Sequence, residues 1–328
     1  GNFWRFPYSA GENGGGAFIL IYLLCVLLVG LPLLMTEYSM GRKSGMSSIE
    51  GVESLARAEG KSGNWGIVGW VGALTASFIL SFYMVISAWL LAFVMQAPTG
   101  KFEGMDAAAS GANFEGTIGN SPYILLLLFI FIAANVVVVG RGVKGGIERA
   151  ATILMPLFFI MLLGVVIFAV TQGDFAAAAA FIFEPKWEDV GFGTFLSALG
   201  QAFFSLGVGV CLMLTYGAYL DQDTNIPRSS VIIAGSDTMV ALIAGFASFP
   251  IVFLAGLDPA GGPGLFLVSM PVAYGDITGG SLVATTFFGL ALFAAFTSSI
   301  SLMEVSVSWL EEREGVTRVG AALGVGFI

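Results

Sequence analysis

Long apolar runs separated by short polar segments dominate the sequence. Seven runs are long enough to cross a bilayer as a helix, which takes about 20 mostly apolar residues. They cover residues 16–40, 65–95, 121–139, 150–171, 195–220, 231–257 and 281–310. A shorter segment, 2–10, precedes the first run, and we expect an eighth helix to begin near Val319. The pattern predicts an all-α integral membrane protein.

The charges between the runs indicate the orientation in the membrane. The first and third loops are rich in basic residues, namely Arg42, Lys43, Arg57, Lys61, Arg141, Lys144 and Arg149. Because Lys and Arg gather on the cytoplasmic side, we expect the odd loops to be cytoplasmic and segment 2–10 to lead outward. Two outer segments, 186–194 and 261–280, are too long for simple turns. The apolar piece 264–274 predicts a re-entrant or interfacial cap.

Composition agrees with this assignment. Of the 328 residues, 57% are hydrophobic and 11% are charged, against about 25% charged residues in soluble proteins. We therefore expect one transmembrane domain over residues 1–328 and no separate soluble domain. A net charge of -9 leaves no basic patch for nucleic acid. The sequence has no histidine, which excludes histidine-based metal sites, and Cys25 and Cys211 lie in apolar runs and are expected to be unpaired.

Nothing in the sequence predicts an enzyme. The nearest approach to a nucleotide-binding motif is the GKS string at 60–62, which lacks the upstream glycine because Leu55 occupies that position. No signal peptide is visible. The chain starts at Gly1 and ends in the apolar run 319–328, which is too short to span a bilayer. We expect both ends to be truncation points.

Two segments rich in glycine lie within or beside the apolar runs. Residues 1–18 mix Asn2, Arg5 and Glu12 with aromatic residues and glycines, for which a surface loop is the ordinary interpretation. Residues 200–216 carry the string SLGVG at 205–209. A glycine costs about 1 kcal/mol relative to alanine in a helix interior, so we expect unwound backbone here. In a membrane such backbone lines a cavity or is buried in protein, and the alternative is a closely packed helix face.

Side chains with oxygen atoms also occur in the middle of two apolar runs. Asp237 lies in the apolar run 232–253, where a carboxylate costs several kcal/mol unless it is paired or binds an ion. The run contains no Lys or Arg, so a bound cation is one partner and hydrogen bonds to neighbouring helices are the alternative. The string AAFTSS at 294–299 supplies hydroxyls. Hydroxyls in membrane helices often bond to their own helix carbonyls, but neutral oxygens also bind hard cations.

Together these segments resemble the neurotransmitter:sodium symporter family over essentially the whole chain. Residues 1–18 are similar to its first-helix signature, 200–216 to its broken sixth helix and 294–299 to its eighth-helix sodium motif. The resemblance implies a LeuT-like inverted-repeat helical bundle, from the outer half of helix 1 to the start of helix 9, in the cell (plasma) membrane. It implies sodium-coupled symport of a neutral, hydrophobic or aromatic amino acid by alternating access. The alternative is a transport-inactive amino-acid sensor or scaffold with the same fold.

The resemblance implies roles for individual residues. Two sodium sites are expected, one formed by Asn2, Ser205 and Asp237 and the other by Ala294, Thr297 and Ser298. The substrate pocket is matched by Ile79, Tyr83, Phe204, Ser205, Gly207, Val210, Ser298 and Leu302. The extracellular gate is matched by Arg5, Tyr83 and Phe204.

Two carboxylates lie outside these sets. The resemblance implies that Glu37 holds the unwound segment, and Glu304 has no assigned role. The small residues Gly207 and Val210 stand where relatives often have bulkier ones, which implies a pocket for large apolar or aromatic side chains.

The resemblance also bears on chloride. The region in which chloride-dependent relatives bind their anion is matched by Tyr22, Gln201, Ser205 and the turn around Asp237. Many relatives have a neutral asparagine in place of Asp237, so a fixed carboxylate here implies that chloride is not required. Family segments that lie before Gly1 and after the start of helix 9 are absent, and with them further sodium ligands and the acidic partner expected for Arg5.

Overall fold

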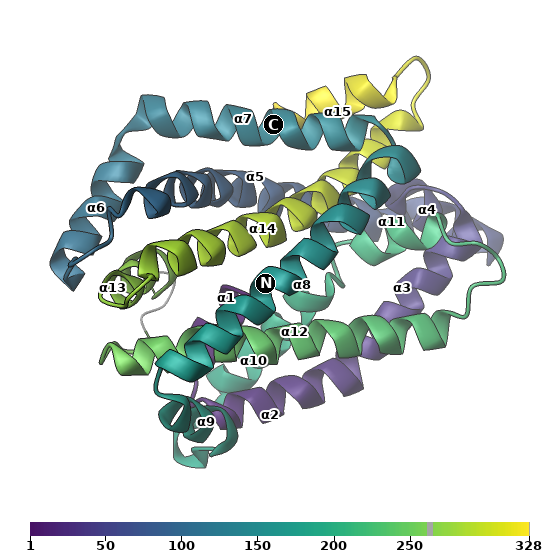
Figure 1. Ribbon diagram of the computed structural model, residues 1–328. Helices are drawn as coiled ribbons and strands as arrows, with labels where there is room; N and C mark the ends of the chain where they lie inside the picture. Colours follow the sequence, from purple (N-terminus) through teal and green to yellow (C-terminus); the bar gives the residue numbers. More distant parts are fainter. Residues whose placement is uncertain (261–264, 328) are drawn as a thin grey trace.

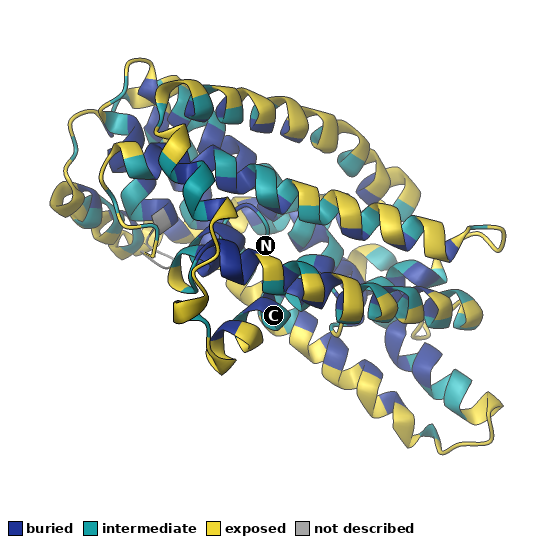
Figure 2. Cartoon of the chain, turned by 90° about the horizontal axis from the view of Figure 1, so that it is seen from below, coloured by how far each residue is buried: buried dark blue, intermediate teal, exposed yellow. Residues whose placement is uncertain are grey.

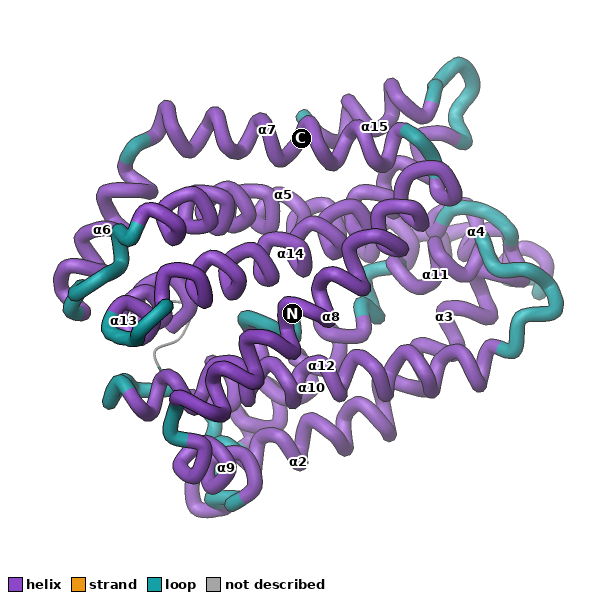
Figure 3. The backbone as a smooth tube through the Cα atoms, viewed as in Figure 1, coloured by secondary structure: helices purple, strands orange, loops and turns teal. Residues whose placement is uncertain are grey.

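The computed structural model describes residues 1–260 and 265–327, which form helices and short loops without a β-strand (Figure 1). Within these residues, six helical stretches are long and apolar enough to cross a membrane: Gly16–Ser44, Gly63–Thr99, Ser121–Gly140, Val143–Gln172, Ile226–Leu254 and Gly280–Glu311. Helix is the expected form because a bilayer offers no hydrogen bonds, so each backbone N–H must find its partner within the segment. Figure 3 shows helix along nearly all of this chain.

The long stretches contain the main helices. The first half of the chain contains α1 (Arg5–Glu12), α2 (Gly16–Cys25), α3 (Leu31–Ser44), α4 (Ser48–Ala58), α5 (Gly66–Gln96), α6 (Ala107–Gly119) and α7 (Ser121–Gly140). The second half contains α8 (Arg149–Gln172), α9 (Phe175–Phe183), α10 (Phe192–Leu206), α11 (Leu212–Ala218), α12 (Ile226–Leu254), α13 (Met270–Gly275), α14 (Gly280–Glu311) and α15 (Arg318–Gly326). Single π-helical segments, Val26–Gly30 and Val143–Glu148, join α2 to α3 and lead into α8.

Polar loop residues fix where several helices begin. The side chain of Asp106 accepts a hydrogen bond from the Ala109 N–H at 2.7 Å and starts α6. Asn225 does the same for α12, accepting from the Arg228 N–H at 3.0 Å. Such caps satisfy backbone donors that the first helical turn leaves free. The polar segments between the apolar runs therefore define helix ends as well as loops.

One core of buried side chains is shared by α5, α8, α12, α13 and α14. In addition, the helices form two groups, each with a core of its own. One core contains Phe6, Tyr22, Leu34, Leu206 and Phe249 and unites α1, α2, α3, α10 and α12, with α11 packed against α3; we call this the α12 group. The other unites α5, α7, α14 and α15, and we call it the α14 group. Figure 1 shows α5 and α14 side by side, with α8 crossing between the groups. The candidate site residues are divided between these two groups.

Large apolar side chains cover the outside of the bundle. Leu28, Phe78 and Leu282 are each more than 70% exposed, and Figure 2 shows exposed positions along the outer faces of the long helices. On a soluble monomer an apolar patch of this extent would be unusual. Lipid covers such a face, and between membrane helices the stabilisation comes mainly from close packing rather than from removal of water.

The predicted runs agree with the observed helices apart from one interruption. The run 195–220 is two helices, α10 and α11, rather than one. The expected short cap at 264–274 is the π-helical segment Leu265–Ser269 followed by α13, both packed into a core with Tyr274 fully buried. Its first residue, Gly264, and the rest of 261–264 lie outside the described residues. Cys25 and Cys211 are buried and unpaired, as expected.

Candidate ion and substrate site

The break between α10 and α11 is made by a left-handed backbone. Gly207, which ends α10, has φ +66°, and Cys211, which precedes α11, has φ 60°. A side chain on Gly207 would place its Cβ 2.8 Å from Cδ2 of Leu212, so both conformation and space require glycine here. The predicted interruption is confirmed, but it begins later than the sequence suggested. Ser205 remains in the last turn of α10.

The free backbone of the break has a partner on α3. The N–H of Gly209 donates to Oε1 of Glu37 at 2.7 Å. A carboxylate is a strong acceptor for a peptide N–H that has lost its place in a helix. The contact expected for Glu37 is therefore present, and it ties the break to the rest of the α12 group.

Asn2, Ser205 and Asp237 come together from three different segments. Nδ2 of Asn2 donates to Oδ1 of Asp237 at 2.5 Å and to the Asp237 carbonyl oxygen at 2.9 Å. The hydroxyl of Ser205 lies 2.5 Å from Oδ1 of Asn2 and also contacts Oδ2 of Asp237. Asn2 precedes α1, Ser205 ends α10 and Asp237 lies within α12. The helix break and the fold thus gather three oxygen-bearing side chains that are far apart in the sequence.

This cluster has more acceptors than protons. The Ser205 hydroxyl carries one hydrogen but lies within hydrogen-bond distance of oxygens on both Asn2 and Asp237. No Lys or Arg is among the hydrogen-bond partners of Asp237 within the described residues. A carboxylate beside neutral oxygens is a donor set that suits a hard cation. The residues are of the kind that binds a hard cation, and in this structure their polar atoms are hydrogen-bonded to one another; their role as an ion site stays a prediction.

The second set of oxygens lies on one turn of α14. The carbonyl oxygen of Ala294 accepts from the hydroxyl of Ser298 at 2.9 Å and from the hydroxyl of Thr297 at 3.1 Å. Both hydroxyls therefore bond to their own helix, which is the common behaviour of such side chains. The three oxygens are adjacent, but within the described residues no hydrogen bond joins them to the Asn2 cluster. Their role as a second ion site stays a prediction.

The residues expected to enclose the substrate lie where the two groups meet. Ile79, Tyr83, Val210 and Leu302 pack in one cluster on the α14 side. Phe204 lies opposite, with its ring centroid 6.3 Å from that of Tyr83. Gly207 differs from the expectation in one respect. The space that a Gly207 side chain would fill is taken by Leu212 and Met213, so its small size serves the backbone of the break.

The expected gate residues are also in contact. The guanidinium carbon of Arg5 lies 5.4 Å from the centre of the Phe204 ring, close enough for a cation–π interaction. Nη1 of Arg5 donates to Oε1 of Gln201 at 2.8 Å. Gln201 is fully buried, and its Nε2 has no partner within the described residues. Arg5, Phe204 and Tyr83 therefore lie together, with Gln201 as the Arg5 partner that the sequence did not indicate.

Glu304, which had no assigned role, forms a buried polar cluster. Its Oε1 accepts from the hydroxyl of Tyr219 at 2.6 Å, and its Oε2 pairs with Nη2 of Arg318 at 2.5 Å. Glu304 is 0% exposed and the Arg318 side chain 15%. A sequence signal was available, since a carboxylate in an apolar run needs a cation and Arg318 follows at the start of the next helix. The cluster links α11 to α14 and α15.

These features define a class of protein. A spanning helix broken at its middle, beside buried oxygens and between two helix groups, is the arrangement of an ion-coupled membrane transporter. A comparison with protein-family models agrees, because the model of the sodium:neurotransmitter symporter family matches residues 1–110 and 108–318. The chain belongs to this family.

Individual relatives agree with this assignment. A sodium-dependent transporter of Haemophilus influenzae is 35% identical over 316 residues, covering 94% of this chain and 69% of the relative. The sodium-dependent transporter YhdH of Bacillus subtilis is 38% identical over 308 residues, covering 94% of this chain and 67% of the relative. The crystal structure of MhsT with L-phenylalanine matches with a TM-score of 0.90 and 39% identity, covering 99% of this chain and 73% of that chain.

Several expectations are settled by these findings. The fold is that of the LeuT-like transporters, and the chain is a multi-pass membrane protein of a sodium-dependent family. The homologues are transporters and not enzymes. The roles of the individual site residues and the identity of the substrate are the subject of the proposal below.

Proposed function

We propose that this protein carries a neutral, hydrophobic or aromatic amino acid across the membrane together with sodium by alternating access. The observation that carries the proposal is the oxygen cluster of Asn2, Ser205 and Asp237 at the helix break. One sodium ion binds between these oxygens. A second binds at Ala294, Thr297 and Ser298 on α14, whose oxygens are adjacent.

The substrate binds between the two helix groups. Its carboxylate meets Tyr83 and the first sodium ion, and its side chain packs against Ile79, Val210 and Leu302. Phe204 and Arg5 close the outer side, since the Arg5 guanidinium lies against the Phe204 ring. MhsT, the structural relative, was crystallised with L-phenylalanine, which supports a large apolar side chain as the cargo.

The distribution of the ion-site residues over the two helix groups explains how sodium binding is coupled to substrate binding. The first ion site belongs to the α12 group, and the second lies on α14. A substrate that contacts both groups stabilises the state in which they are closed around it. Each ligand then lowers the free energy of binding of the other by the same amount, because coupling between sites is reciprocal. The two groups tilt relative to each other to open the site inward.

We further propose that transport does not need chloride. Asp237 places a fixed negative charge beside Ser205 and Tyr22, whose hydroxyl lies 3.5 Å from Ser205 Oγ. A second anion at this place would be repelled by that carboxylate. Uptake by the protein should therefore be equal in chloride and in gluconate. Loss of uptake in gluconate would contradict this part of the proposal alone.

The main test is uptake and binding by the protein expressed from its complete gene. Labelled leucine, phenylalanine, tryptophan and tyrosine are offered to proteoliposomes with an inward gradient of sodium or of potassium. We expect accumulation only with sodium and a preference for the larger side chains. Binding without accumulation would favour the sensor or scaffold, and equal accumulation with both ions would disprove sodium coupling.

A further inference from the structure

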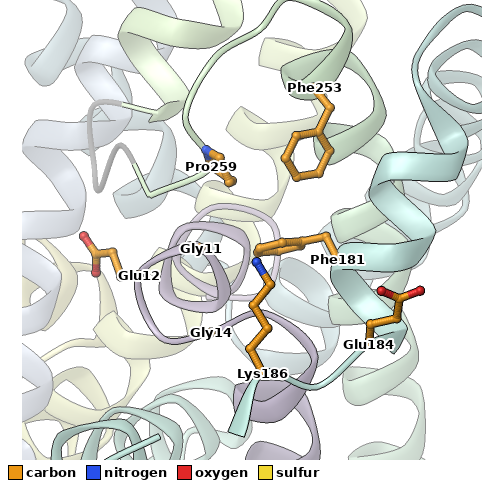
Figure 4. A pocket seen from close by; sticks show the side chains of 8 residues that line it. All are labelled: Gly11, Glu12, Gly14, Phe181, Glu184, Lys186, Phe253 and Pro259. Carbon is orange, nitrogen blue, oxygen red and sulfur yellow. The ribbon is translucent and has the colours of Figure 1, made fainter. Parts of the chain in front are cut away.

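A cavity away from the central site opens where the ends of three helices, α1, α9 and α12, meet. It has a volume of about 520 Å³ and is lined by Gly11, Glu12, Gly14, Phe181, Glu184, Lys186, Phe253 and Pro259 (Figure 4). These residues come from the end of α1, the end of α9 and the segment that follows it, and the end of α12. None of them belongs to the ion, substrate or gate sets described above. The volume lies within the range of about 300–1,000 Å³ found for small-molecule sites.

The cavity walls are held by backbone contacts. A Cβ on Gly11 would lie only 2.0 Å from the carbonyl oxygen of Pro259, so α1 touches the segment after α12 directly. On the other side, Gly15 and Pro185 form an antiparallel bridge. The end of α1 is thus fixed between two outer segments. The walls of the cavity are therefore set by backbone contacts and not by side chains alone.

One wall of the cavity is aromatic. The rings of Phe181 and Phe253 meet edge to face with their centroids 5.5 Å apart. Both also pack against Phe249, which is fully buried. Phe181 and Phe253 themselves are half-buried, so part of each ring faces the cavity. This wall suits an apolar group such as an amino-acid side chain or the first methylenes of a lipid.

The remaining lining carries both signs of charge. In Figure 4 the Lys186 side chain points toward Phe181, and Glu12 and Glu184 lie on opposite sides of it. Among the side chains that the structure describes, which leave out that of Asp189, no carboxylate lies within 4.0 Å of the Lys186 ammonium group. A lysine lining a cavity in this way is a donor for an oxyanion, and the two carboxylates are acceptors for an ammonium group.

We propose that this outer cavity binds a zwitterion that carries an apolar group, with its oxyanion at Lys186, its ammonium at Glu12 or Glu184 and its apolar part against Phe181 and Phe253. Two sources supply this chemistry, a free hydrophobic amino acid outside the cell and the headgroup of phosphatidylethanolamine in the outer leaflet. Both combine an ammonium group and an oxyanion with an apolar portion.

The position of the cavity gives the ligand a regulatory effect. Glu12 is the last residue of α1, whose other end follows Asn2, and Phe253 lies on α12, which also carries Asp237. Both helices that meet at the Asn2–Asp237 contact therefore end at the cavity. A ligand that contacts both helix ends stabilises the position of Asn2 relative to Asp237. This regulatory step rests on the proposed function, whereas binding to the cavity does not.

The first experiment measures binding of labelled phenylalanine to the detergent-purified protein, expressed from its complete gene, in potassium without sodium. Under these conditions the central site is weak, and no sodium-site residue lines the outer cavity. We expect saturable binding that Lys186→Ala weakens about tenfold, because a charge-assisted contact is lost. Phenethylamine and 3-phenylpropionate, each lacking one charge, should compete poorly. Lys101→Ala, which removes another exposed lysine from an outer loop, is the matched control and should bind normally.

The second experiment distinguishes the two sources. The protein is placed in nanodiscs of phosphatidylglycerol with or without phosphatidylethanolamine. If the lipid headgroup is the occupant, phosphatidylethanolamine raises the unfolding temperature of the unaltered protein and of Lys101→Ala. It does not raise that of Lys186→Ala. This result does not depend on whether phenylalanine binds in detergent.

The proposal is overturned if the Lys186→Ala variant loses neither kind of binding, or if neither zwitterion binds to the unaltered protein. Sodium-dependent binding and uptake by the same variant are measured in parallel. They report on the central site, so failure of the outer site and failure of sodium coupling give different results.

Discussion

Asp237 shows how a single side chain sets the character of the candidate ion site. It contributes a charge and two acceptors to a cluster whose other members, Asn2 and Ser205, are neutral. A carboxylate at membrane depth is stable only with a compensating partner, and its described partners supply hydrogen bonds but no positive charge. In the proposed mechanism, sodium provides the positive charge that the neighbouring side chains do not supply.

Replacement of Asp237 by asparagine tests whether its negative charge is needed for sodium binding. The substitution keeps the size and removes the charge, so the sodium concentration for half-maximal binding should rise at least about tenfold, which is about 1.4 kcal/mol. The asparagine variant should also gain a dependence on chloride, because an anion can then occupy the vacated charge position. Sodium titrations of substrate binding in chloride and in gluconate measure both effects. Asp223→Asn, an exposed carboxylate in a loop, serves as the control, and an unchanged sodium requirement in Asp237→Asn would refute the assignment.

Glu304 illustrates a different kind of buried charge, one with a protein partner. Removing one member of a buried ion pair leaves the other unpaired, at a cost of about 3–5 kcal/mol. Because Arg318 also pairs with Glu311 at 2.7 Å, the cost for Glu304→Gln should lie nearer about 3 kcal/mol. Thermal unfolding in detergent should show a clear decrease in stability. Glu311→Gln removes the more exposed partner of the same arginine and should change the unfolding temperature little. Equal decreases in the two variants would mean that the burial of Glu304 does not determine its contribution to stability.

At the scale of helices, the sequence predicted the elements well because membrane helices obey a simple length rule. Every apolar run corresponds to helix, and the glycines at 207 and 209 indicated the break. The position of the break could not be read from glycine content alone. It depends on which residues adopt left-handed backbone, and Cys211 does so although it is not a glycine. The Arg5–Gln201 contact also escaped prediction because it depends on how helices distant in sequence pack. The Glu304–Arg318 pair joins consecutive helices, and it was missed although a carboxylate in an apolar run indicates a nearby cation.

The break itself can be tested by Gly207→Ala. The left-handed conformation costs an alanine about 1–2 kcal/mol, and the added methyl group would meet Leu212 at 2.8 Å. We expect reduced stability and at least about tenfold weaker substrate binding, because Ser205 and Val210 lie on either side of Gly207 in the chain. Gly235→Ala in α12 is the matched control, since a Cβ there meets nothing within 4 Å. Binding by Gly207→Ala equal to that of the control would show that the left-handed turn is dispensable.

At the scale of the whole molecule, the arrangement of cores matters more than any single contact. The α12 group and the α14 group each have their own buried core, and the candidate site occupies the boundary between them. A third core, shared by α5, α8, α12, α13 and α14, also joins the two groups, so a tilt of one group against the other must repack side chains in that core. Hydrogen bonds that cross the boundary must then break and reform. Two such bonds reach α14: Tyr216 on α11 donates to Ser301 at 2.7 Å, and Tyr219, the residue after α11, donates to Glu304 at 2.6 Å.

Tyr219→Phe should therefore shift the balance between closed and open states. It removes a bond to a charged group, worth about 1.5–3 kcal/mol, while Glu304 keeps Arg318. Cys211, buried in the break and against Gly72 of α5, reports the separation of the groups. In a Cys25→Ala background, alkylation of Cys211 should be at least about tenfold faster in Tyr219→Phe, and sodium with substrate should slow the alkylation.

The control is Tyr123→Phe. The Tyr123 hydroxyl makes only a 3.7 Å contact with Met95 Sδ, so its removal should leave the alkylation rate of Cys211 equal to that of the background. Unchanged alkylation in Tyr219→Phe would mean that the boundary is held closed by packing rather than by this hydrogen bond.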